Sequence, residues 1–345
     1  MQKKEVNAMA LDIGIDLGTS TILASDAERK VVIKEPSVVA VDTRTRKVLD
    51  IGENVYHMIG RTPDKIQVVR PLKDGVIADY AMTEALIRHL MQRISNNRLI
   101  KPRVIVCIPS ITTGVEAQSV IDATVAAGTR QVYLIEEPVA AALGAGIDIT
   151  KPNGNMVVDI GGGTADIAVL SLGGVVCKAS IKTAGQAFDA AIIKYMRGQY
   201  NLLIGEKTAE DIKMGIGSVY LGGENPTMEA KGRNLLTGLP TKVTVSQQEL
   251  YPYLHEVALQ IVKEVQGVME KTPPELVADI RDNGLVMTGG GALLGGLDEL
   301  LEERITVRAR LADNVVECVS LGTIKGFDYL GTLFDGFIRS STHSH

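Results

Sequence analysis

The sequence contains no tryptophan and only 4 phenylalanines among its 345 residues, and aromatic residues make up just 4% of it. This scarcity argues against aromatic platforms on which bases or sugars stack. The core must instead be built from aliphatic side chains and methionine, because hydrophobic residues still account for 45% of the chain. Together with 35 glycines, this composition favours an α/β architecture whose closely packed strands and helices are joined by glycine-rich turns.

Cysteine is also scarce, with 3 widely separated residues, Cys107, Cys177 and Cys318. They provide neither a disulfide framework nor a CxxC metal site, and they fit a reducing cytoplasm. The 5 histidines lack the spacing of metal ligands. No apolar run approaches the ~18–20 residues of a membrane-spanning helix, and Glu5 and Asp12 interrupt any signal-peptide core. We therefore expect a cytoplasmic protein.

Acidic residues outnumber basic ones, 41 against 36, which gives a formal net charge of −5. This balance argues against a nucleic-acid binder that works by overall charge, and we expect no nucleic-acid partner. A length of 345 residues predicts about two to three units with cores of their own. The polar break at residues 148–155 is typical of a domain junction.

Strand and helix patterns alternate almost to the end of the chain. Apolar residues at helical spacing predict helices over residues 81–95 and 246–271. Short apolar runs predict strands over residues 103–108 and 131–135. Such alternation is typical of an α/β fold.

One motif occurs twice. Ile13-Gly-Ile-Asp-Leu-Gly-Thr resembles Val157-Val-Asp-Ile-Gly-Gly-Gly-Thr, and each reads as a strand that ends in aspartate and continues into glycine and a hydroxyl residue. The pattern therefore predicts two duplicated domains that face a shared ligand.

The chemistry of this repeated turn suits phosphate. Glycine lets backbone N–H groups approach an anion closely, and Asp16 and Asp159 could hold Mg²⁺ directly or through its waters. The hydroxyl side chains available to phosphate oxygens are those of Thr19, Ser20, Thr21 and Thr164. Either turn alone could be a plain hairpin, but the matched pair favours a phosphate-binding role.

A third glycine cluster follows the predicted strand at residues 285–287 and reads Thr-Gly-Gly-Gly-Ala over residues 288–292. A turn from strand to helix suits nucleotide binding at a helix N-terminus. The Rossmann fingerprint GxGxxG is absent, because Gly295 falls one residue late. By itself, the cluster could be only a tight connection.

Two adjacent carboxylates, Glu136 and Glu137, precede Pro138 at a junction between strand and helix. A carboxylate held there could orient or polarise the water that attacks a γ-phosphate. The alternative is an acid that is favoured at this position by the helix macrodipole.

Glu210 and Lys213 lie three residues apart on the helix predicted over residues 208–214, so both can project from one face. They could bind ribose hydroxyls and flank a base. The alternative is an ordinary surface pair that contributes ~0.2–0.5 kcal/mol.

Taken in order, these motifs resemble the actin-like ATPase superfamily and, within it, the bacterial actins of the MreB/Mbl family. The resemblance covers residues of about 11 to 335. It implies an α/β, actin-like two-lobed fold of duplicated ribonuclease-H-like domains with an ATP cleft between them. Domain I would comprise residues 1–145 plus about 312–345, with a small subdomain at about 33–66. Domain II would comprise residues 146–311, with a small subdomain at about 182–244.

The resemblance also implies roles for individual residues. Asp16 and Asp159 would serve Mg²⁺, and Glu137 would polarise the hydrolytic water with help from Thr164. Glu137 is preferred to Glu136 because it directly precedes the Pro-x-Ala-Ala-Ala run shared across the superfamily. The residues expected to bind ATP are Gly18, Thr19, Ser20, Thr21, Gly161, Gly162, Gly163, Thr164, Glu210, Asp211, Ile212, Lys213, Gly289, Gly290, Gly291 and Ala292.

A member of this family would be a slow, Mg²⁺-dependent ATP hydrolase that polymerises and determines rod shape. Its partners would be further copies of itself, the inner face of the cytoplasmic membrane, and cell-wall elongation proteins such as MreC and RodZ-type proteins. Leu99 and Ile100, in a basic stretch, are the candidate membrane contact, although they could equally be a core contact leading into the next strand.

Three other functions within the superfamily are open to such a sequence. A chaperone-type ATPase would need a further substrate-binding domain, which we do not expect here. A sugar or acetate kinase would need a base facing a substrate hydroxyl, and no segment stands out for that role. An actin that positions plasmids or organelles would differ only in its partners.

Overall fold

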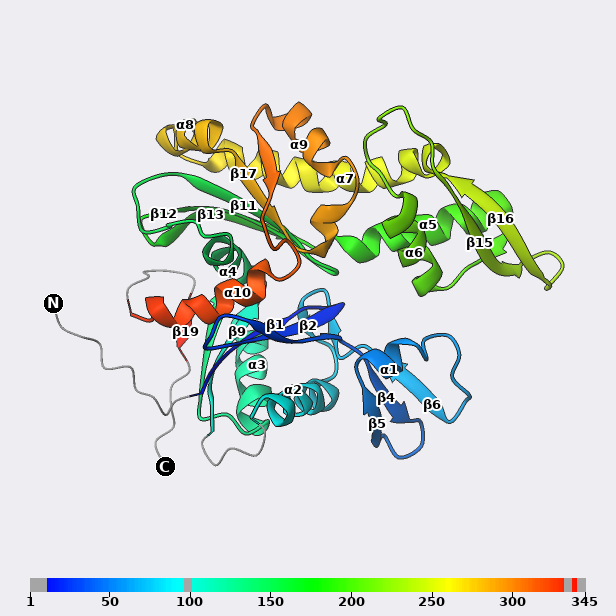
Figure 1. The fold of residues 1–345 in the computed structure, drawn as a ribbon, viewed down its shortest axis with the longest axis horizontal. Helices are drawn as coiled ribbons and strands as arrows, with labels where there is room; N and C mark the ends of the chain where they lie inside the picture. The colour runs from blue at the N-terminus through cyan, green and yellow to red at the C-terminus, as the bar shows by residue number, and fades with distance from the viewer. Residues whose placement is uncertain (1–10, 96–100, 332–336, 340–345) are drawn as a thin grey trace. The chain divides into compact units, whose positions relative to one another are not determined.

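The computed structural model describes residues 11–95, 101–331 and 337–339. The chain forms two compact units (Figure 1). Unit 1 comprises residues 1–58, 62–146 and 319–345, and unit 2 comprises residues 59–61 and 147–318. Within the described residues, no helix is both long and apolar enough to cross a membrane.

Unit 1 is built around a six-stranded sheet with the order β19-β10-β9-β1-β2-β3. Its strands are β1 Asp12–Leu17, β2 Thr21–Asp26, β3 Val31–Pro36, β9 Arg103–Ile108, β10 Gln131–Glu136 and β19 Phe337–Arg339. β1, β9 and β10 run parallel to one another, whereas β2, β3 and β19 pair antiparallel with their neighbours. The most deeply buried of the parallel strands is β9, which reads as a nearly continuous apolar run, whereas β1 and β10 carry polar residues at some half-buried positions.

Helices and small sheets complete unit 1. The helices are α1 Glu53–Tyr56, α2 Tyr80–Ser95, α3 Gly114–Ala126, α4 Glu137–Gly144, α10 Cys318–Lys325 and the 3-10 helix η2 Gly326–Tyr329. The first residue of α10, Cys318, belongs to unit 2. The short strands are β4 Val39–Asp42, β5 Val48–Ile51 and β6 Ile66–Val69 in one sheet, and β7 Leu72–Lys73 with β8 Val76–Ile77 in another. The Thr113 side chain and Glu116 form a capping box that starts α3.

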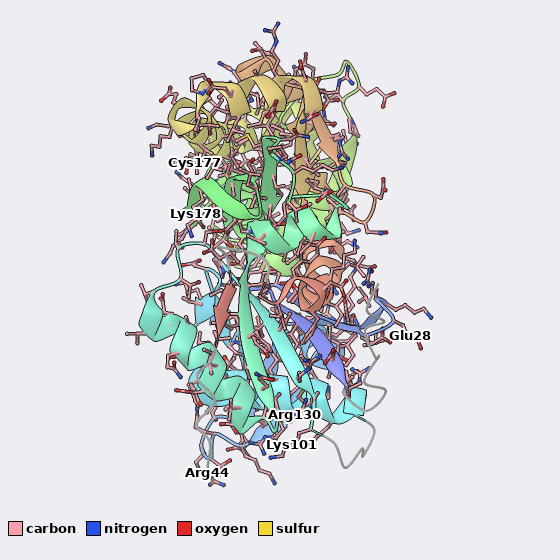
Figure 2. The ribbon with its side chains drawn as sticks, turned by 90° about the vertical axis from the view of Figure 1, so that its left-hand side faces the viewer. Glu28, Arg44, Lys101, Arg130, Cys177 and Lys178 are labelled. Atoms are coloured by element: carbon pink, nitrogen blue, oxygen red, sulfur yellow. The ribbon has the colours of Figure 1, made fainter. Side chains whose placement is uncertain are left out.

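Unit 2 contains a five-stranded sheet with the order β13-β12-β11-β17-β18. Its strands are β11 Asn155–Ile160, β12 Ala165–Ser171, β13 Gly174–Ile181, β17 Leu285–Thr288 and β18 Ala309–Leu311. β13 is an edge strand that carries half-buried Cys177 and exposed Lys178 (Figure 2). A charge at this position discourages the edge from pairing with another chain.

The remaining elements of unit 2 are helices and a second small sheet. The helices are α5 Gly185–Tyr200, α6 Glu206–Ile216, α7 Gln247–Lys271, α8 Pro274–Asn283, α9 Leu297–Ile305 and the 3-10 helix η1 Gly290–Leu293. The small sheet has the order β14-β15-β16, with β14 Leu202–Leu203, β15 Thr227–Asn234 and β16 Pro240–Ser246. Ser246 and Glu249 form the capping box that starts α7.

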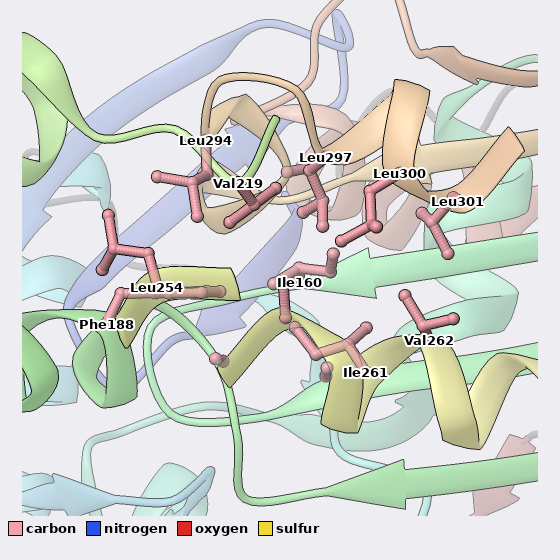
Figure 3. Close-up of a cluster of buried hydrophobic side chains, with 14 of the residues drawn as sticks. Ile160, Phe188, Val219, Leu254, Ile261, Val262, Leu294, Leu297, Leu300 and Leu301 are labelled. Carbon is pink, nitrogen blue, oxygen red and sulfur yellow. The ribbon is translucent and has the colours of Figure 1, made fainter. Parts of the chain in front are cut away.

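The core of unit 2 packs α5, α7 and α9 against the sheet (Figure 3). Phe188, one of only 4 phenylalanines, is completely buried at its centre. The other labelled members are aliphatic: Ile160, Val219, Leu254, Ile261, Val262, Leu294, Leu297, Leu300 and Leu301. An aliphatic core of this kind is the one expected from the composition.

The two large sheets share one topology. In unit 1, the order β3-β2-β1-β9-β10 has two antiparallel pairs followed by two parallel pairs. In unit 2, the order β13-β12-β11-β17-β18 has the same directions. The repeated turns join equivalent strands, β1 to β2 and β11 to β12, so the predicted internal duplication is confirmed at the level of topology.

Within unit 1, α4 and α10 approach each other closely at Gly322, where a Cβ atom would lie 1.6 Å from the carbonyl oxygen of Ala140. We expect Gly322→Ala to reduce the free energy of unfolding by at least ~1–3 kcal/mol, because the added methyl overpacks the contact. The measurement is urea denaturation followed by circular dichroism. Gly198 in α5 is the control: nothing lies within 4 Å of its Cβ position, so Gly198→Ala should instead stabilise by ~0.5–1 kcal/mol.

Candidate functional site

The first repeated turn lies in unit 1 where β1 ends and β2 begins. Asp16 is half-buried near the end of β1, with Leu23 of β2 and Cys107 of β9 as its register partners. A Cβ atom on Gly18 would lie 2.4 Å from the Thr21 carbonyl oxygen, so only glycine fits without displacement. The turn is therefore tight, with a carboxylate at its base.

The hydroxyl residues of this turn differ in their surroundings. Thr19 is buried, and its Oγ1 accepts a hydrogen bond from the backbone N–H of Gly75 at 2.9 Å. The Ser37 hydroxyl donates to the Gly18 carbonyl oxygen at 2.6 Å. The Ser20 carbonyl oxygen accepts from the Ser37 N–H at 3.0 Å. These bonds hold the turn in shape, and the Thr19 hydroxyl takes part in them as an acceptor.

Glu137 lies at the same edge of the unit 1 sheet as Asp16. Asp16 and Ile135 both pair with Cys107, so they are level with each other on either side of β9. Two strand spacings are about 10 Å. Glu137 begins α4 two residues later, with Pro138 in the first turn, and is only 8% exposed. A buried carboxylate therefore sits at a helix N-terminus, which favours its charge, and on the edge that carries Asp16.

The second repeated turn lies in unit 2 between β11 and β12. The Gly161 N–H donates to the Thr164 carbonyl oxygen at 2.9 Å, which closes the turn. The first two N–H groups of α5 also hold it, because Gly185 N–H donates to Gly161 O at 3.0 Å and Gln186 N–H donates to Gly162 O at 2.8 Å. The turn is thus fixed both internally and by the helix that follows β13.

The third glycine cluster packs against this turn, as the sequence could not show. Gly289 has φ +85°, and a Cβ atom there would lie 2.3 Å from the Ile160 carbonyl oxygen. A Cβ atom on Gly291 would lie 3.0 Å from the Gly161 carbonyl oxygen. Exposed Gly290 and buried Ala292 belong to the 3-10 helix that follows. Glycine at residues 289 and 291 is what allows the two turns to meet.

Asp159 lies at the base of this second turn and is 4% exposed. The Thr288 hydroxyl, at the end of the parallel neighbour β17, donates to Asp159 Oδ1 at 2.6 Å. Burial raises the pKa of Asp159 to about 7; the bond from Thr288 opposes this rise, and the facing Asp166 carboxylate adds to it. The site therefore holds a carboxylate that a cation would stabilise strongly.

The predicted base-binding residues lie on α6 and face different ways. Ile212 is completely buried in the hydrophobic core, and Asp211 is exposed. Glu210 is half-buried. Lys213 points to α5, where its Nζ lies 2.9 Å from Asp189 Oδ1 and donates to the Gly185 carbonyl oxygen at 3.1 Å.

The structure thus brings the predicted residues into two sets. The set in unit 1 lies along one sheet edge and consists of Asp16, the turn at residues 18–21 and Glu137. The set in unit 2 consists of Asp159, the turn at residues 161–164, residues 289–292 and the first turn of α5, to which Lys213 is bonded. Leu99 and Ile100 lie outside the described residues. Thr288, Asp166 and Asp189 also belong to the unit 2 set, although they were not predicted as site residues. Of these, only Thr288 had a visible signal, since it ends a strand immediately before the glycines.

The donor set fits a magnesium ion that is held jointly with phosphates. Among the residues that the structure describes, no group of three or more His, Cys, Asp or Glu side chains could hold a metal alone. Mg²⁺ usually binds through one or two carboxylates together with substrate phosphates and waters. The buried Asp159 suits such a site and does not suit an all-protein metal cage.

Comparison with known proteins identifies the family. The family model described as MreB/Mbl protein matches residues 10–333. Cell shape-determining protein Mbl of Bacillus cereus is 49% identical over 315 residues, which cover 91% of this chain and 95% of that protein. Cell shape-determining protein MreB of Escherichia coli K12 is 43% identical over 336 residues, covering 96% and 97%.

The solved structures agree. MreB5 of Spiroplasma citri bound to ADP is 37% identical, has a TM-score of 0.89, and covers 93% of this chain and 97% of that chain. The same protein bound to AMPPNP also has a TM-score of 0.89. These matches and the duplicated sheets confirm the predicted α/β, actin-like two-lobed fold class. The chain belongs to the MreB/Mbl protein family.

Proposed function

We propose that this protein is an ATP-dependent bacterial actin that polymerises, organises cell-wall synthesis and determines rod shape. The observation that carries the proposal is the pair of Asp-x-Gly turns on two sheets that share five strands of the same order and direction, each turn with a carboxylate at its base. The names of the relatives from Bacillus cereus and Escherichia coli support the role in cell shape. The ADP and AMPPNP complexes of the Spiroplasma citri protein support nucleotide binding.

In this proposal, units 1 and 2 correspond to the predicted domains I and II, and the turns at residues 18–21 and 161–164 bind phosphates through backbone N–H groups. Asp16 and Asp159 would hold Mg²⁺, which when bound supplies charge neutralisation at the phosphates. Residues 289–292 and the predicted base-binding residues of α6 would enclose adenosine, Ile212 contributing only its backbone because its side chain is buried.

Hydrolysis would depend on Glu137 and Thr164. The Glu137 carboxylate, held on the first turn of α4, would accept a hydrogen bond from the attacking water and orient it. Thr164, which is 5% exposed immediately before β12, would assist the hydrolytic water. Both groups are fixed by backbone elements, which is how a positioned water is obtained.

Polymerisation has a candidate contact surface on unit 2, which we name the leucine tip: Leu235, Leu236 and Leu239 in the β15–β16 turn. They are 40%, 78% and 64% exposed. Asn234 Oδ1 accepts hydrogen bonds from the N–H groups of Leu236 and Thr237 at 2.9 and 3.0 Å, so the leucines are held in place by an ordered turn. Preorganised apolar side chains bind at a lower entropic cost.

The opposite end of unit 2 offers an apolar partner for the leucine tip. Leu172 is 59% exposed in the turn between β12 and β13. That turn lies beside the start of β11, whereas α5 begins at the end of β11 and leads to the small sheet. Figure 1 shows the β12–β13 hairpin and the β15–β16 hairpin at opposite ends of the unit. Contacts between unlike ends of identical subunits generate open filaments, so the occupant we propose for the tip is a second copy.

We expect Leu236→Asp to raise the critical concentration for ATP-dependent assembly about 10-fold or more, because it removes a leucine contact that is worth ~1.5–3 kcal/mol. Assembly is measured by pelleting and by electron microscopy with ATP and magnesium. Val32→Asp, which puts the same charge on an exposed apolar residue of unit 1, should assemble normally. Wild-type protein that stays monomeric with ATP on lipid would contradict the proposed function itself.

Membrane attachment at the inner face of the cytoplasmic membrane, and binding of MreC and RodZ-type elongation proteins, complete the proposal. Lys101 and Arg130 are exposed where β9 and β10 begin (Figure 2). Lys101 is next in sequence to the candidate contact Leu99 and Ile100. Basic residues there would favour an anionic surface. The alternatives are an actin that positions plasmids or organelles and a chaperone-type ATPase. The names of the relatives favour the role in cell shape over both.

A further inference from the structure

The Lys213 side chain is largely buried and already bonded to α5, which a lysine that only contacts a ligand would not need. Its side chain is 15% exposed, and its Nζ lies 2.9 and 3.0 Å from the two carboxylate oxygens of Asp189, whose side chain is 16% exposed. The Nζ also donates to the Gly185 carbonyl oxygen at 3.1 Å. Gly185 and Asp189 lie one turn apart on α5, so a single ammonium group ties α6 to the first turn of α5.

The same first turn of α5 controls the phosphate-binding turn. Its leading N–H groups, those of Gly185 and Gln186, donate to the carbonyl oxygens of Gly161 and Gly162 at 3.0 and 2.8 Å. In a trans peptide the carbonyl and the N–H point in opposite directions. Holding these two carbonyls towards α5 therefore directs the N–H groups of Gly162 and Gly163 away from α5, and so orients them to bind an anion.

Space at Gly185 makes this arrangement possible. A Cβ atom there would lie 3.2 Å from the Gly161 carbonyl oxygen, 3.5 Å from Gly162 Cα and 3.6 Å from Lys213 Nζ. The Gly185 residue is therefore packed between the phosphate-binding turn and the lysine, and a displacement of either is felt by the other.

We infer that Asp189 and Lys213 form a positioning pair that preorganises the turn at residues 161–164 for the phosphates of ATP, and that Lys213 serves ATP chiefly through this turn. The inference rests on the proposed function, because it assumes that ATP binds there. The bond is charge-assisted and largely buried, so it is strong enough to select one conformation of α5. Burial raises the pKa of Asp189 and the Lys213 ammonium opposes this rise, which is consistent with mutual dependence of the two side chains.

The test is a double-mutant cycle on Mg·ATP binding, measured by calorimetry with the full chain. Asp189→Asn and Lys213→Met should each weaken binding about 10-fold, the factor that corresponds to ~1.4 kcal/mol. The double variant should also lose about 10-fold and not 100-fold, because both changes break the same contact. Lys213→Arg, which can still reach Asp189, should recover most of the affinity. Lys194→Met and Asp282→Asn, both at exposed residues, are the controls and should bind as wild type does.

A second measurement separates this role from direct contact with the ribose. The affinity ratio of ATP to 2′-deoxy-ATP should be the same in wild type and in Lys213→Met, because the pair acts on the phosphate-binding turn. Loss of that ratio in Lys213→Met, or Asp189→Asn binding within about twofold of wild type, would overturn the inference. Independent, multiplying losses in the double variant would also overturn it. Failure of the wild-type protein to bind ATP would instead refute the proposed function. A circular dichroism spectrum like that of wild type, and a cooperative melting transition above the temperature of the binding assay, confirm that each variant is folded.

Discussion

Replacing Glu137 by glutamine should reduce the rate of ATP hydrolysis about 10²–10⁴-fold, the range over which a positioned general base contributes. Glutamine has nearly the same shape but cannot accept a proton or polarise water as a carboxylate does. Glu137 is 8% exposed on the first turn of α4. Because glutamine fills the same buried space, the substitution leaves the backbone in place. Phosphate release at saturating ATP is the measurement.

In this variant the ATP affinity should stay nearly unchanged although the hydrolysis rate falls. We expect Glu137→Gln to bind ATP with an affinity within about twofold of wild type, and to form filaments that persist, since the nucleotide stays as ATP. The loss of a favourable charge at a helix N-terminus costs only ~0.3–1 kcal/mol of stability. An equal loss of ATP binding and hydrolysis would indicate a structural role for this carboxylate.

Glu136→Gln is the matched control. Glu136 immediately precedes α4 as its N-cap and makes no side-chain capping hydrogen bond. It therefore offers the same chemical change one residue away. Normal hydrolysis in Glu136→Gln with a large loss in Glu137→Gln would support the assignment made from the Pro-x-Ala-Ala-Ala run. The reverse result would transfer the catalytic role to Glu136.

Much of the fold was predictable because the large sheets and long helices follow simple apolar patterns. The strand predicted at residues 103–108 is β9 Arg103–Ile108, and the helix predicted at 246–271 is α7 Gln247–Lys271, which begins after a capping box. Each of these two elements buries a regularly spaced set of apolar residues, and that spacing in the sequence predicts the type of element directly. The repeated Asp-x-Gly turn likewise indicated the duplication.

The small sheet of unit 2 escaped prediction because its turn is apolar and the outward-facing residues of its strands are mostly charged or polar. Charged residues lie in the strands of the β15–β16 hairpin, such as Lys231 opposite Lys242, while the leucines lie in the turn. A half-buried strand normally alternates apolar and polar residues, and a turn is normally polar. The strands do alternate, with Ala230 and Val245 buried, but the turn departs from the rule. An exposed apolar turn is a feature that contact with a partner would explain.

The connections within the site also could not be read from the sequence. The bond between Thr288 and Asp159 joins residues 129 apart and depends on the register of β11 with β17. The pair of Lys213 with Asp189 depends on how α5 packs against α6. Motifs identify residue types suited to phosphate and magnesium, but which side chains hold one another in place is set by tertiary packing.

The second large effect is expected at Asp159, where Asp159→Asn should stabilise the nucleotide-free protein and abolish its response to Mg·ATP. The carboxylate is buried, faces Asp166, and has its pKa raised to about 7. A shift of this size corresponds to up to ~4 kcal/mol of unfavourable interaction above neutral pH. Asparagine keeps an oxygen that can accept the bond from Thr288 while removing the charge.

The pH dependence of this gain has a definite sign. Below about pH 3 the carboxyl is largely protonated in both the folded and unfolded states, so Asp159 and asparagine are nearly equivalent. As the pH rises towards 7, the unfolded state ionises first, and the wild type loses stability relative to Asp159→Asn. Melting curves between pH 5 and pH 8 should therefore diverge, with the variant higher by at least ~4 °C at pH 8. A constant difference across this range would contradict the raised pKa.

Magnesium and nucleotide should reverse the order of stability. A cation beside Asp159 compensates the buried charge, so Mg·ATP should raise the melting temperature of wild type by mass action and leave Asp159→Asn almost unchanged. Asp166→Asn is the matched control, because it relieves the same repulsion in the β11–β12 pair but keeps the proposed ligand. It should be stabilised without nucleotide and still respond to Mg·ATP. If Mg·ATP raises the melting temperature of both variants equally, Asp159 is not a ligand and its burial needs another explanation. If only Asp159→Asn loses this rise, the destabilising carboxylate is the part of unit 2 that the metal–nucleotide complex requires.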